Sequence, residues 1–209
     1  MLDSQEVQAS FFVVGEWAQR CPDSVKALHQ AGHEIMNHSA THPHLSQCSR
    51  EEIIHQVQEG NQIISALIGE TPTLFRCPYG EYNDEIITTV RSQGMTPVQW
   101  DVDSLDWQGL SAGEITERVV SRTKSGSILL FHNGAAHTPE ALPNVITMLK
   151  NQGFRFVKLS ELLLDGDYLL DSAGVQHPVE PEADRSASTP SEAADGSESA
   201  SAPAPQREL

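Results

Sequence analysis

Short apolar runs alternate with longer segments of helical periodicity over most of the chain, and this alternation predicts a β/α architecture. Six apolar runs are expected to form strands, at residues 9–14, 33–37, 73–76, 96–101, 127–131 and 154–157. Strands joined in this way by helices fit either a doubly wound sheet or a barrel derived from the (β/α)8 plan. Both plans place functional side chains at the carboxyl ends of the strands, so a site is expected there.

The segments between these strands carry recognisable signals for helix starts. Ser49 with Glu52, and Ser111 with Glu114, have the spacing of capping boxes, in which each side chain accepts a hydrogen bond from a backbone amide at the helix start. Thr138 is followed by a proline, which predicts that Thr138 is the N-cap of a further helix. Amphipathic helices that begin in this way are expected to pack on the sheet.

The last part of the chain, residues 165–209, differs in composition from the rest. Ser, Ala, Pro, Glu and Asp dominate it, and large apolar residues are almost absent after Val179. It holds 10 of the 29 acidic residues but only 2 of the 13 basic ones, and therefore half of the net charge of −16. Such a segment cannot bury enough apolar surface to offset its ordering entropy. We therefore expect one folded domain at residues 1–164 and a disordered acidic tail at residues 165–209.

The charge, the hydropathy and the cysteines of the chain limit its partners and its location. A net charge of −16 argues against nucleic acid or an anionic membrane as the main partner, since either favours a basic face. No run of about 18 apolar residues is present, so no transmembrane segment is expected. Residues 1–8 lack the pattern of a signal peptide, which leaves the localisation unknown. Cys21, Cys48 and Cys77 are expected to be reduced thiols, because they form neither a disulfide framework nor a metal motif.

Two histidines follow the second predicted strand. His38 and His42 are four residues apart, so on a helical turn both imidazoles would point the same way and could share one metal ion. Zn²⁺ accepts such nitrogens at about 2.0–2.1 Å, which makes zinc the expected metal. The alternative is a pair of polar loop histidines without a ligand. His44 lies off the shared face and is expected to face solvent.

A cation and a turn follow the third predicted strand. Arg76 comes just before Pro78, Tyr79 and Gly80. The turn is expected to hold the guanidinium rigidly and to aim backbone amides at a developing negative charge. The alternative is an ordinary surface turn.

Acidic residues and a histidine follow the fourth and fifth predicted strands. Asp101, Asp103 and Asp106 could hold a histidine or an arginine in place, while the neighbouring Trp107 walls a pocket. The alternative is an acidic loop with one core tryptophan. His132 ends the apolar run 128–131, where a general acid would lie, although it could equally be a satisfied polar group. The functional hypothesis depends on the whole set of strand ends.

Together these motifs resemble the polysaccharide deacetylase family, the NodB-homology enzymes of carbohydrate esterase family 4. The resemblance runs from about residue 9 to residue 163, in the family's order and spacing. The matching segments are residues 10–15, residues 32–39 with His42 and Pro43, residues 76–80, residues 103–107 and residues 130–132. The resemblance implies a distorted (β/α) barrel of the NodB-homology type. It also implies metal-dependent removal of acetyl groups from N-acetylated sugars, such as those in peptidoglycan or chitin-like polymers.

The resemblance further implies a role for each matching residue. His38 and His42 would bind the divalent metal, usually zinc, which polarises the acetamide carbonyl and an attacking water. Tyr79 would donate a backbone N–H to the oxyanion, and His132 would protonate the leaving amine. Asp106 would tune that acid, and Arg76 would orient the catalytic base. The substrate or acetyl pocket would be lined by Pro78, Trp107 and Leu130.

The chain departs from the family at its start. The family's first motif, an Asp-Asp-Gly segment on the first barrel strand, provides the base and a third metal ligand, and it has no counterpart here. Residues 1–8 resemble instead the end of the family's first helix. We therefore expect the barrel to lack its first strand and the domain at residues 1–164 to be incomplete at its N-terminus. Asp3 is a poor substitute, because it is expected to lie on a helix without a second carboxylate beside it.

Three hypotheses follow for the function. The first is a polysaccharide deacetylase whose recorded start is too late, or a fragment of one, which would act outside the cytoplasm or at the cell envelope if an export segment precedes it. The second is a non-catalytic carbohydrate-binding or interaction protein derived from the family. The third is another metal-dependent amidohydrolase that acts on small amides.

Overall fold

The computed structural model describes residues 1–179 together with residues 207 and 208. Its contacts divide the chain into two compact units, Met1–Leu162 with Arg207–Leu209, and Leu163–Gln206. The first unit contains all the residues that the sequence singles out for chemistry. The predicted boundary at residue 164 stays a prediction, because most of the second unit lies outside the described residues.

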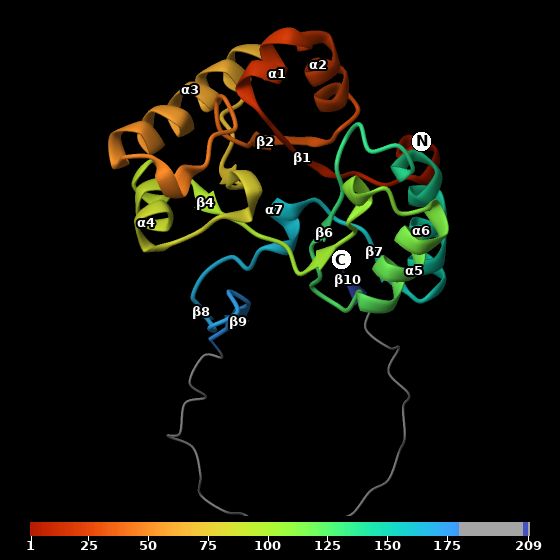
Figure 1. The fold of residues 1–209 in the computed structure, drawn as a ribbon. Coiled ribbons are helices and arrows are strands. Elements are labelled where there is room, and N and C mark those ends of the chain that lie inside the picture. Colours follow the sequence, from red (N-terminus) through yellow and green to blue (C-terminus); the bar gives the residue numbers. More distant parts are fainter. Residues whose placement is uncertain (180–206, 209) are drawn as a thin grey trace, which may run out of the picture. The chain divides into compact units, whose positions relative to one another are not determined.

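The first unit is built on parallel strands joined by helices (Figure 1). Four strands form one sheet in the order β1 (Ser10–Val13), β2 (Glu34–Asn37), β3 (Leu74–Phe75) and β4 (Thr96–Pro97). Two further parallel pairs join β5 (Val102–Asp103) to β6 (Leu129–Leu130), and β7 (Phe154–Arg155) to β10 (Arg207–Glu208). Parallel pairing brings the carboxyl ends of successive strands to the same edge, which is what a shared site requires.

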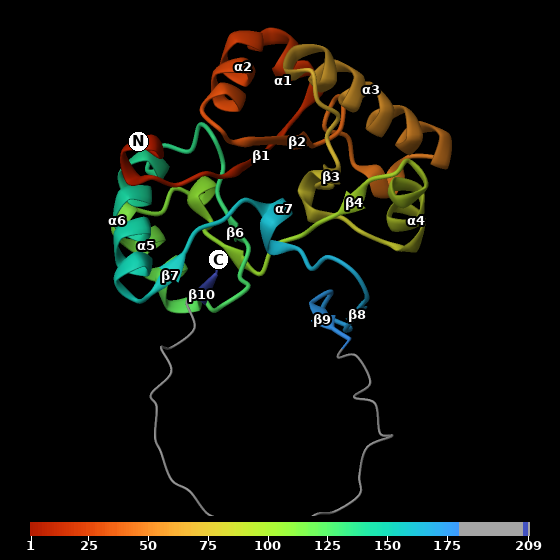
Figure 2. The same cartoon turned by 180° about the vertical axis from the view of Figure 1, so that it is seen from behind.

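Helices connect these strands and cover them. They are α1 (Gly15–Arg20), α2 (Pro22–Gln30), α3 (Arg50–Ile68), α4 (Asp84–Ser92), α5 (Ala112–Arg122), α6 (Thr138–Asn151) and α7 (Leu159–Leu162). Short 3-10 turns occur at η1 (Asp3–Gln5), η2 (Leu45–Gln47), η3 (Pro78–Gly80) and η4 (Asp106–Gln108). Helices α1 and α2 pack on α3, and α5 lies beside α6, as both views show (Figures 1 and 2). None of the helices in the described part of the chain is long and apolar enough to cross a bilayer.

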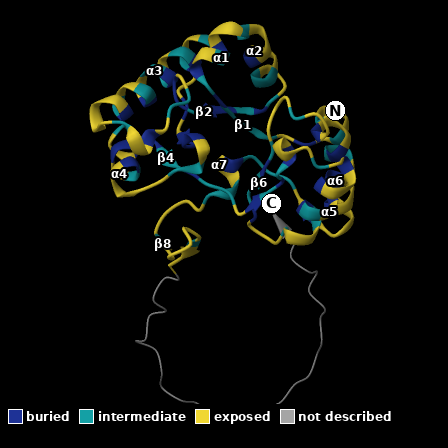
Figure 3. Cartoon of the chain, viewed as in Figure 1, coloured by how far each residue is buried: buried dark blue, intermediate teal, exposed yellow. Residues whose placement is uncertain are grey.

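The core lies between the strands and the inner faces of these helices (Figure 3). Its clusters follow the layers, with one under α1, α2 and α3, one under α3 and α4, and one under α5 and α6. Buried members of the three clusters are, in that order, Val13, Ala18, Val25, Ile35 and Ile64; Leu45, Ile53, Val57, Phe75, Cys77, Ile86, Val90 and Met95; and Val102, Val119, Val145, Leu149 and Phe154.

Both predicted capping boxes are confirmed, and one predicted N-cap is wrong. The Ser49 side chain accepts from the Glu52 amide at the start of α3, and Ser111 and Glu114 make the same exchange at α5. Helix α6 begins at Thr138 itself, with His137 as its N-cap. The Thr138 hydroxyl instead donates a hydrogen bond to a buried carboxylate described below.

Each of the six predicted strands contains an observed strand that is shorter than predicted, and strand β5 was not predicted. The fourth prediction loses most, four of its six residues. Strand β4 ends at Pro97, whose missing N–H cannot continue a ladder. The chain then pairs with a different neighbour from Val102 onward. Between the two strands, the Asp101 carboxylate accepts hydrogen bonds from the Ser127 hydroxyl and the Ile128 amide, which takes the place of ladder bonds.

The strand order follows a barrel plan without closing it. Among the strands that the structure describes, no ladder links β4 to β5, β6 to β7 or β7 to β1. Strand β1 pairs only with β2 within the same described range. An open seam beside β1 is what the predicted absence of the family's first strand would leave.

The described part of the second unit contains a short hairpin. Strands β8 (Tyr168–Leu170) and β9 (Gln176–Pro178) pair antiparallel. The Asp171 carboxylate accepts hydrogen bonds from the amides of Ala173 and Val175 and so fixes the turn, in which Gly174 has φ of 80°. Disorder was predicted here from composition, which does not reveal a turn that side-chain hydrogen bonds can fix. The rest of the predicted tail, residues 180–206 and 209, lies outside the described residues.

Candidate active site

The two predicted ligand histidines lie together just after β2. The rings of His38 and His42 have their centroids 4.9 Å apart, at an interplanar angle of 72°. The predicted helical turn is wrong: residues 38–42 are not helical, and Ser39 and His42 have φ values of 70° and 63°. This left-handed backbone, which is uncommon for residues other than glycine, brings the rings together instead.

The buried Asn37 holds that backbone in place. Its Nδ2 donates to the Val57 carbonyl and to the Asn61 side chain on α3, each at 2.8 Å, and its Oδ1 accepts from the Ser39 amide at 2.8 Å. Gly60 makes room for this amide, since a Cβ at residue 60 would lie 2.5 Å from Asn37 Oδ1. Asn37 lies in the motif at residues 32–39, but no local pattern in the sequence indicates this positioning role.

His38 is held in one orientation and kept neutral. Its Nδ1 lies 2.7 Å from the Arg76 carbonyl oxygen, so Nδ1 carries the proton and Nε2 keeps its lone pair. Desolvation, which is the largest cause, and repulsion from His42, Arg76 and His132 together lower the pKa of His38 to about 4, against the hydrogen bond to Arg76, which raises it. The repulsion places His132 within electrostatic reach of His38. A neutral imidazole with a fixed tautomer is the form that binds metal.

Arg76 is a buried cation with no carboxylate partner among the described residues. Its side chain lies over the Phe12 ring, with the guanidinium carbon 4.2 Å from the ring centroid, and donates to the Gln99 carbonyl at 3.1 Å. Its Nε is buried and has no hydrogen-bond partner within residues 1–179. Desolvation lowers the pKa of Arg76 to about 10. The implied role of orienting a catalytic base stays a prediction, because no base contacts Arg76 here.

The turn after Arg76 presents a backbone amide. Tyr79 has φ of 59°, and none of the described residues accepts a hydrogen bond from its N–H. The next residue is fastened, since Gln99 donates to the Gly80 carbonyl at 2.7 Å. A Cβ at Gly80 would lie 2.7 Å from the Trp100 ring, so only glycine fits there. The predicted rigid turn is therefore present, with an unpaired amide as an oxyanion donor requires.

The ring of Tyr79 lies between two histidines. It meets His42 edge to face, with centroids 4.6 Å apart, and stacks flat on His44 at 3.9 Å and 11°. His44 Nδ1 lies 2.7 Å from one carboxylate oxygen of Glu81. The other carboxylate oxygen accepts a hydrogen bond from the Ser46 amide at 3.0 Å. His44 therefore does not simply face solvent, as predicted, because one face of its ring stacks on Tyr79 and its Nδ1 contacts Glu81.

Asp106 and His132 form a hydrogen-bonded pair. Asp106 Oδ1 lies 2.8 Å from His132 Nδ1, and Oδ2 accepts from the His132 amide at 2.8 Å and from the Thr138 hydroxyl at 2.5 Å. Burial alone would raise the pKa of Asp106, but these hydrogen bonds outweigh it and hold the pKa below its usual range. Asp106 is thus the acidic residue that holds a histidine, whereas Asp101 and Asp103 bind other groups. Sequence reasoning missed Thr138 as a partner, because nothing in the spacing links residues 106 and 138.

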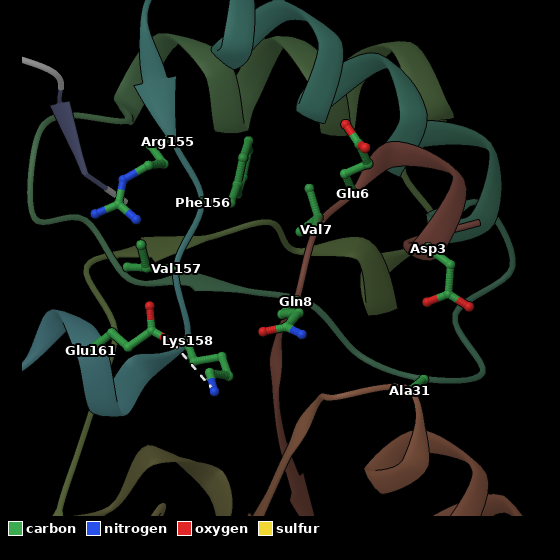
Figure 4. A pocket seen from close by; sticks show the side chains of 10 residues that line it. All are labelled: Asp3, Glu6, Val7, Gln8, Ala31, Arg155, Phe156, Val157, Lys158 and Glu161. Carbon is green, nitrogen blue, oxygen red and sulfur yellow. Dashed lines mark ion pairs between the residues drawn. The ribbon is translucent and has the colours of Figure 1, made fainter.

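The predicted substrate-lining residues differ in exposure. Pro78 and Leu130 are buried, whereas Trp107 is 60% exposed and so is not a core tryptophan. Their assignment to an acetyl pocket stays a prediction. A pocket of about 510 Å³ lies elsewhere in this unit, between the N-terminal segment and the residues after β7 (Figure 4). None of the predicted site residues lines it, and its walls are residues 3, 6–8, 31, 155–158 and 161.

The donor set fits two of the three protein ligands that a catalytic zinc takes. His38 and His42 supply two imidazole nitrogens, and His38 already has the required tautomer. No group of three or more His, Cys, Asp or Glu residues suited to a metal is found within the described part of the chain. Asp3 does not complete the set, since its carboxylate lies near His33, at 3.8 Å. A complete three-ligand site therefore requires a donor beyond the described protein groups.

Comparisons with known proteins agree with this geometry. A family model described as polysaccharide deacetylase matches residues 1–98. A peptidoglycan-N-acetylglucosamine deacetylase from Bacillus cereus is 36% identical over 165 residues, which make up 77% of this chain and 60% of that protein. A chitooligosaccharide deacetylase from Sinorhizobium fredii is 32% identical over 179 residues, or 85% of this chain and 82% of that protein.

Solved structures share the fold as well. The crystal structure of a CE4 family pseudoenzyme from Bacillus anthracis superposes with a TM-score of 0.75 at 33% sequence identity, and the match covers 77% of this chain and 57% of that one. The chain spans only 60% of the length of its Bacillus cereus relative, but most of the Sinorhizobium fredii protein. Because it is 32% identical to the Sinorhizobium fredii deacetylase over 82% of that protein, the chain belongs to the polysaccharide deacetylase family.

Proposed function

We propose that this chain is a metal-dependent N-deacetylase that hydrolyses the acetamide bond of N-acetylated sugars, with zinc as its metal. The observation that carries the proposal is the convergence of four groups at successive strand ends. These groups are the His38–His42 pair, the buried Arg76, the unpaired Tyr79 amide and the Asp106–His132 pair. Such a set offers ligands, a cation, an oxyanion donor and an acid in one place.

Each group has a definite task in amide hydrolysis. A divalent cation bound at His38 and His42 would supply Lewis acidity to an amide carbonyl and an attacking water. The proton that this water loses needs a base, which none of the groups described at the histidine pair provides. The Tyr79 N–H donates to the oxygen that gains negative charge, and the buried charge of Arg76 favours the same anionic state. His132 gives a proton to the leaving amine, while Asp106 fixes its tautomer and stabilises its charged form.

The substrate class is inferred from the relatives. Proteins named for peptidoglycan N-acetylglucosamine and for chitooligosaccharides are both at least 32% identical to this chain. N-acetylated amino sugars in a polymer or oligomer are the chemistry that these names share. Peptidoglycan as the substrate would place the activity at the cell envelope.

Acetate release tests the proposal. The purified chain, supplied with zinc or cobalt and an acetylated chito-oligosaccharide, should release acetate continuously. His132→Gln should lower the rate by about 10²-fold or more, since a positioned general acid contributes at least that much. His55→Gln is the matched control, because His55 lies on α3, with its side chain 70% exposed, and pairs only with Glu59. Equal rates for the two variants would refute the role of His132.

A non-catalytic carbohydrate-binding protein is the second candidate. It is favoured by the two-histidine donor set of the described residues and by the likeness to a structure named as a pseudoenzyme. A pure binding protein has no need for an acid beside a metal pair, which is why we rank this candidate second. Binding of the acetylated oligosaccharide without any metal-dependent acetate release would reverse the ranking.

A further inference from the structure

His44, Glu81 and Ser46 link the two loops that carry the metal pair and the oxyanion donor. The His44 ring lies flat on the Tyr79 ring, at 3.9 Å and 11°. His44 Nδ1 is 2.7 Å from Glu81 Oε1, and Glu81 Oε2 accepts from the Ser46 amide at 3.0 Å. His44 and Ser46 follow β2, whereas Tyr79 and Glu81 follow β3. The contacts therefore close a ring of interactions between two strand ends.

The Tyr79 side chain needs such support, although the turn around it is held by hydrogen bonds from the Gly80 amide to the Cys77 carbonyl and from the Glu81 amide to the Pro78 carbonyl, each at 3.2 Å. The φ of 59° at Tyr79 is a left-handed conformation that a tyrosine rarely adopts without constraint from its surroundings. Its side chain cannot be fixed by burial, since the residue is 58% exposed. Among the described residues, its ring–ring contacts are those with His42 and His44. Of these two, His44 makes the flat stack, and its Nδ1 is anchored by Glu81.

We propose that His44 is a positioning residue, which clamps the Tyr79 ring with the help of Glu81 and so keeps the left-handed backbone that turns the Tyr79 N–H toward the reacting oxygen. The inference rests on the proposed function, because it assigns a purpose to the Tyr79 amide. It gives His44 a role through Tyr79 and not through the metal or the substrate. Rotation of Tyr79 to an ordinary right-handed conformation would break the stack and redirect the amide.

Two readouts test the clamp in the full chain. The first is the NMR signal of the Tyr79 amide in metal-free protein, together with its three-bond HN–Hα coupling, which depends on φ. The second is kcat and KM for acetate release with zinc and an acetylated chito-oligosaccharide. The variants are His44→Ala, which removes the ring, His44→Phe, which restores a flat ring without Nδ1, and Glu81→Gln, which keeps the shape of the anchor. His55→Ala is the control, as an exposed histidine paired to a glutamate on α3.

We expect His44→Ala to shift the Tyr79 amide signal and to change its coupling. The same variant should lower kcat by about tenfold or more with little change in KM, because small misplacements of a catalytic donor are costly. His44→Phe, which keeps the stack but loses the Glu81 anchor, should restore both readouts in large part, with a residual shift like that of Glu81→Gln. Both shifts should be smaller than that of His44→Ala, and His55→Ala should change neither readout. If His44→Ala does not fold, an unshifted Tyr79 signal in Glu81→Gln would overturn the clamp.

The proposal is overturned if Tyr79 keeps its signal and coupling in His44→Ala, or if His44→Phe fails to restore them in large part. The NMR readout does not require turnover. An inactive parent chain with a displaced Tyr79 amide in His44→Ala would therefore count against the proposed function and leave the clamp standing.

Discussion

His38 shows how neighbouring groups fix the protonation of a single residue. Its Nδ1 contacts the Arg76 carbonyl, and desolvation brings its pKa to about 4. The unfolded chain, with a histidine pKa of about 6.5, takes up a proton first as the pH falls. The contribution of His38 to stability is therefore complete above about pH 6.5 and is lost as the pH falls toward about 4.

The first prediction concerns this loss. In the metal-free chain, His38 should contribute about 2 kcal/mol to a decrease in the free energy of unfolding between pH 7 and pH 5. Urea denaturation at both pH values measures the decrease. It should become smaller by roughly that amount in His38→Gln and stay unchanged in His55→Gln, whose side chain is 70% exposed in the parent chain. Equal decreases in the parent and His38→Gln would contradict the burial of a neutral imidazole.

Asp106 shows the opposite chemistry, a buried carboxylate kept charged by its donors. Three hydrogen bonds, two from His132 and one from Thr138, hold its pKa below the usual range despite burial. A depressed carboxylate pKa gives stability that is present above about pH 4, the value for an unfolded aspartate, and is lost as the pH falls through the folded value.

The second prediction isolates the Thr138 bond. Thr138→Val keeps the shape but removes the donor, and should lower the free energy of unfolding at pH 7 by about 2 kcal/mol, as expected for a hydrogen bond to a charged group. The deficit should be smaller at pH 3, because a lower pH favours the protonated form of Asp106, which accepts this bond less strongly. Thr147→Val, on the exposed side of the same helix, removes only a bond to the Pro143 carbonyl and should have a small effect. A deficit that is the same at both pH values would argue against the assigned bond.

At the scale of elements, α3 acts as the support of the histidine loop. Val57 and Asn61 on this helix accept hydrogen bonds from Asn37, and Gly60 leaves the space in which its amide lies. Asn37 in turn fixes the Ser39 amide between the strand and the ligand pair. This helix surface therefore sets the geometry of the His38–His42 pair.

The third prediction compares two helical glycines. Gly60→Ala should be destabilising by about 1–3 kcal/mol, because overpacking against Asn37 outweighs the gain in helix propensity. Gly113→Ala on α5 should be stabilising by up to about 1 kcal/mol, because its Cβ would enter open space. Thermal or urea denaturation of both variants measures the difference. If both substitutions stabilise the chain, the close approach of Gly60 to Asn37 is wrong.

At the scale of the whole molecule, the sequence predicted six of the strands and the helix starts at Ser49 and Ser111, because apolar runs and capping boxes are local patterns. The proximity of His38 to His42 was predicted correctly from a wrong cause, since left-handed residues and not a helical turn bring the rings together. The partnership of Thr138 with Asp106 and the stack of His44 on Tyr79 were missed. Both join segments distant along the chain, and no local pattern encodes such contacts.

The barrel-like order also explains why the site is both assembled and short of a ligand. The histidine pair and the Tyr79 amide follow β2 and β3 of one parallel sheet, and the Asp106–His132 pair follows β5 and β6 of another. Strand β1 has a single partner among the described strands, and the donor set of the described residues stops at two histidines. Zinc bound by these ligands alone should be held weakly.

The most direct measurement of the central claim is metal-dependent acetate release by the purified chain from an acetylated chito-oligosaccharide, followed over a range of zinc concentrations. We predict sustained release that keeps rising beyond one equivalent of zinc, as weak two-histidine binding requires, and that is abolished in a variant with both His38→Ala and His42→Ala. Release that is absent at every zinc concentration, or that is equal in the parent chain and the double variant, would contradict the claim.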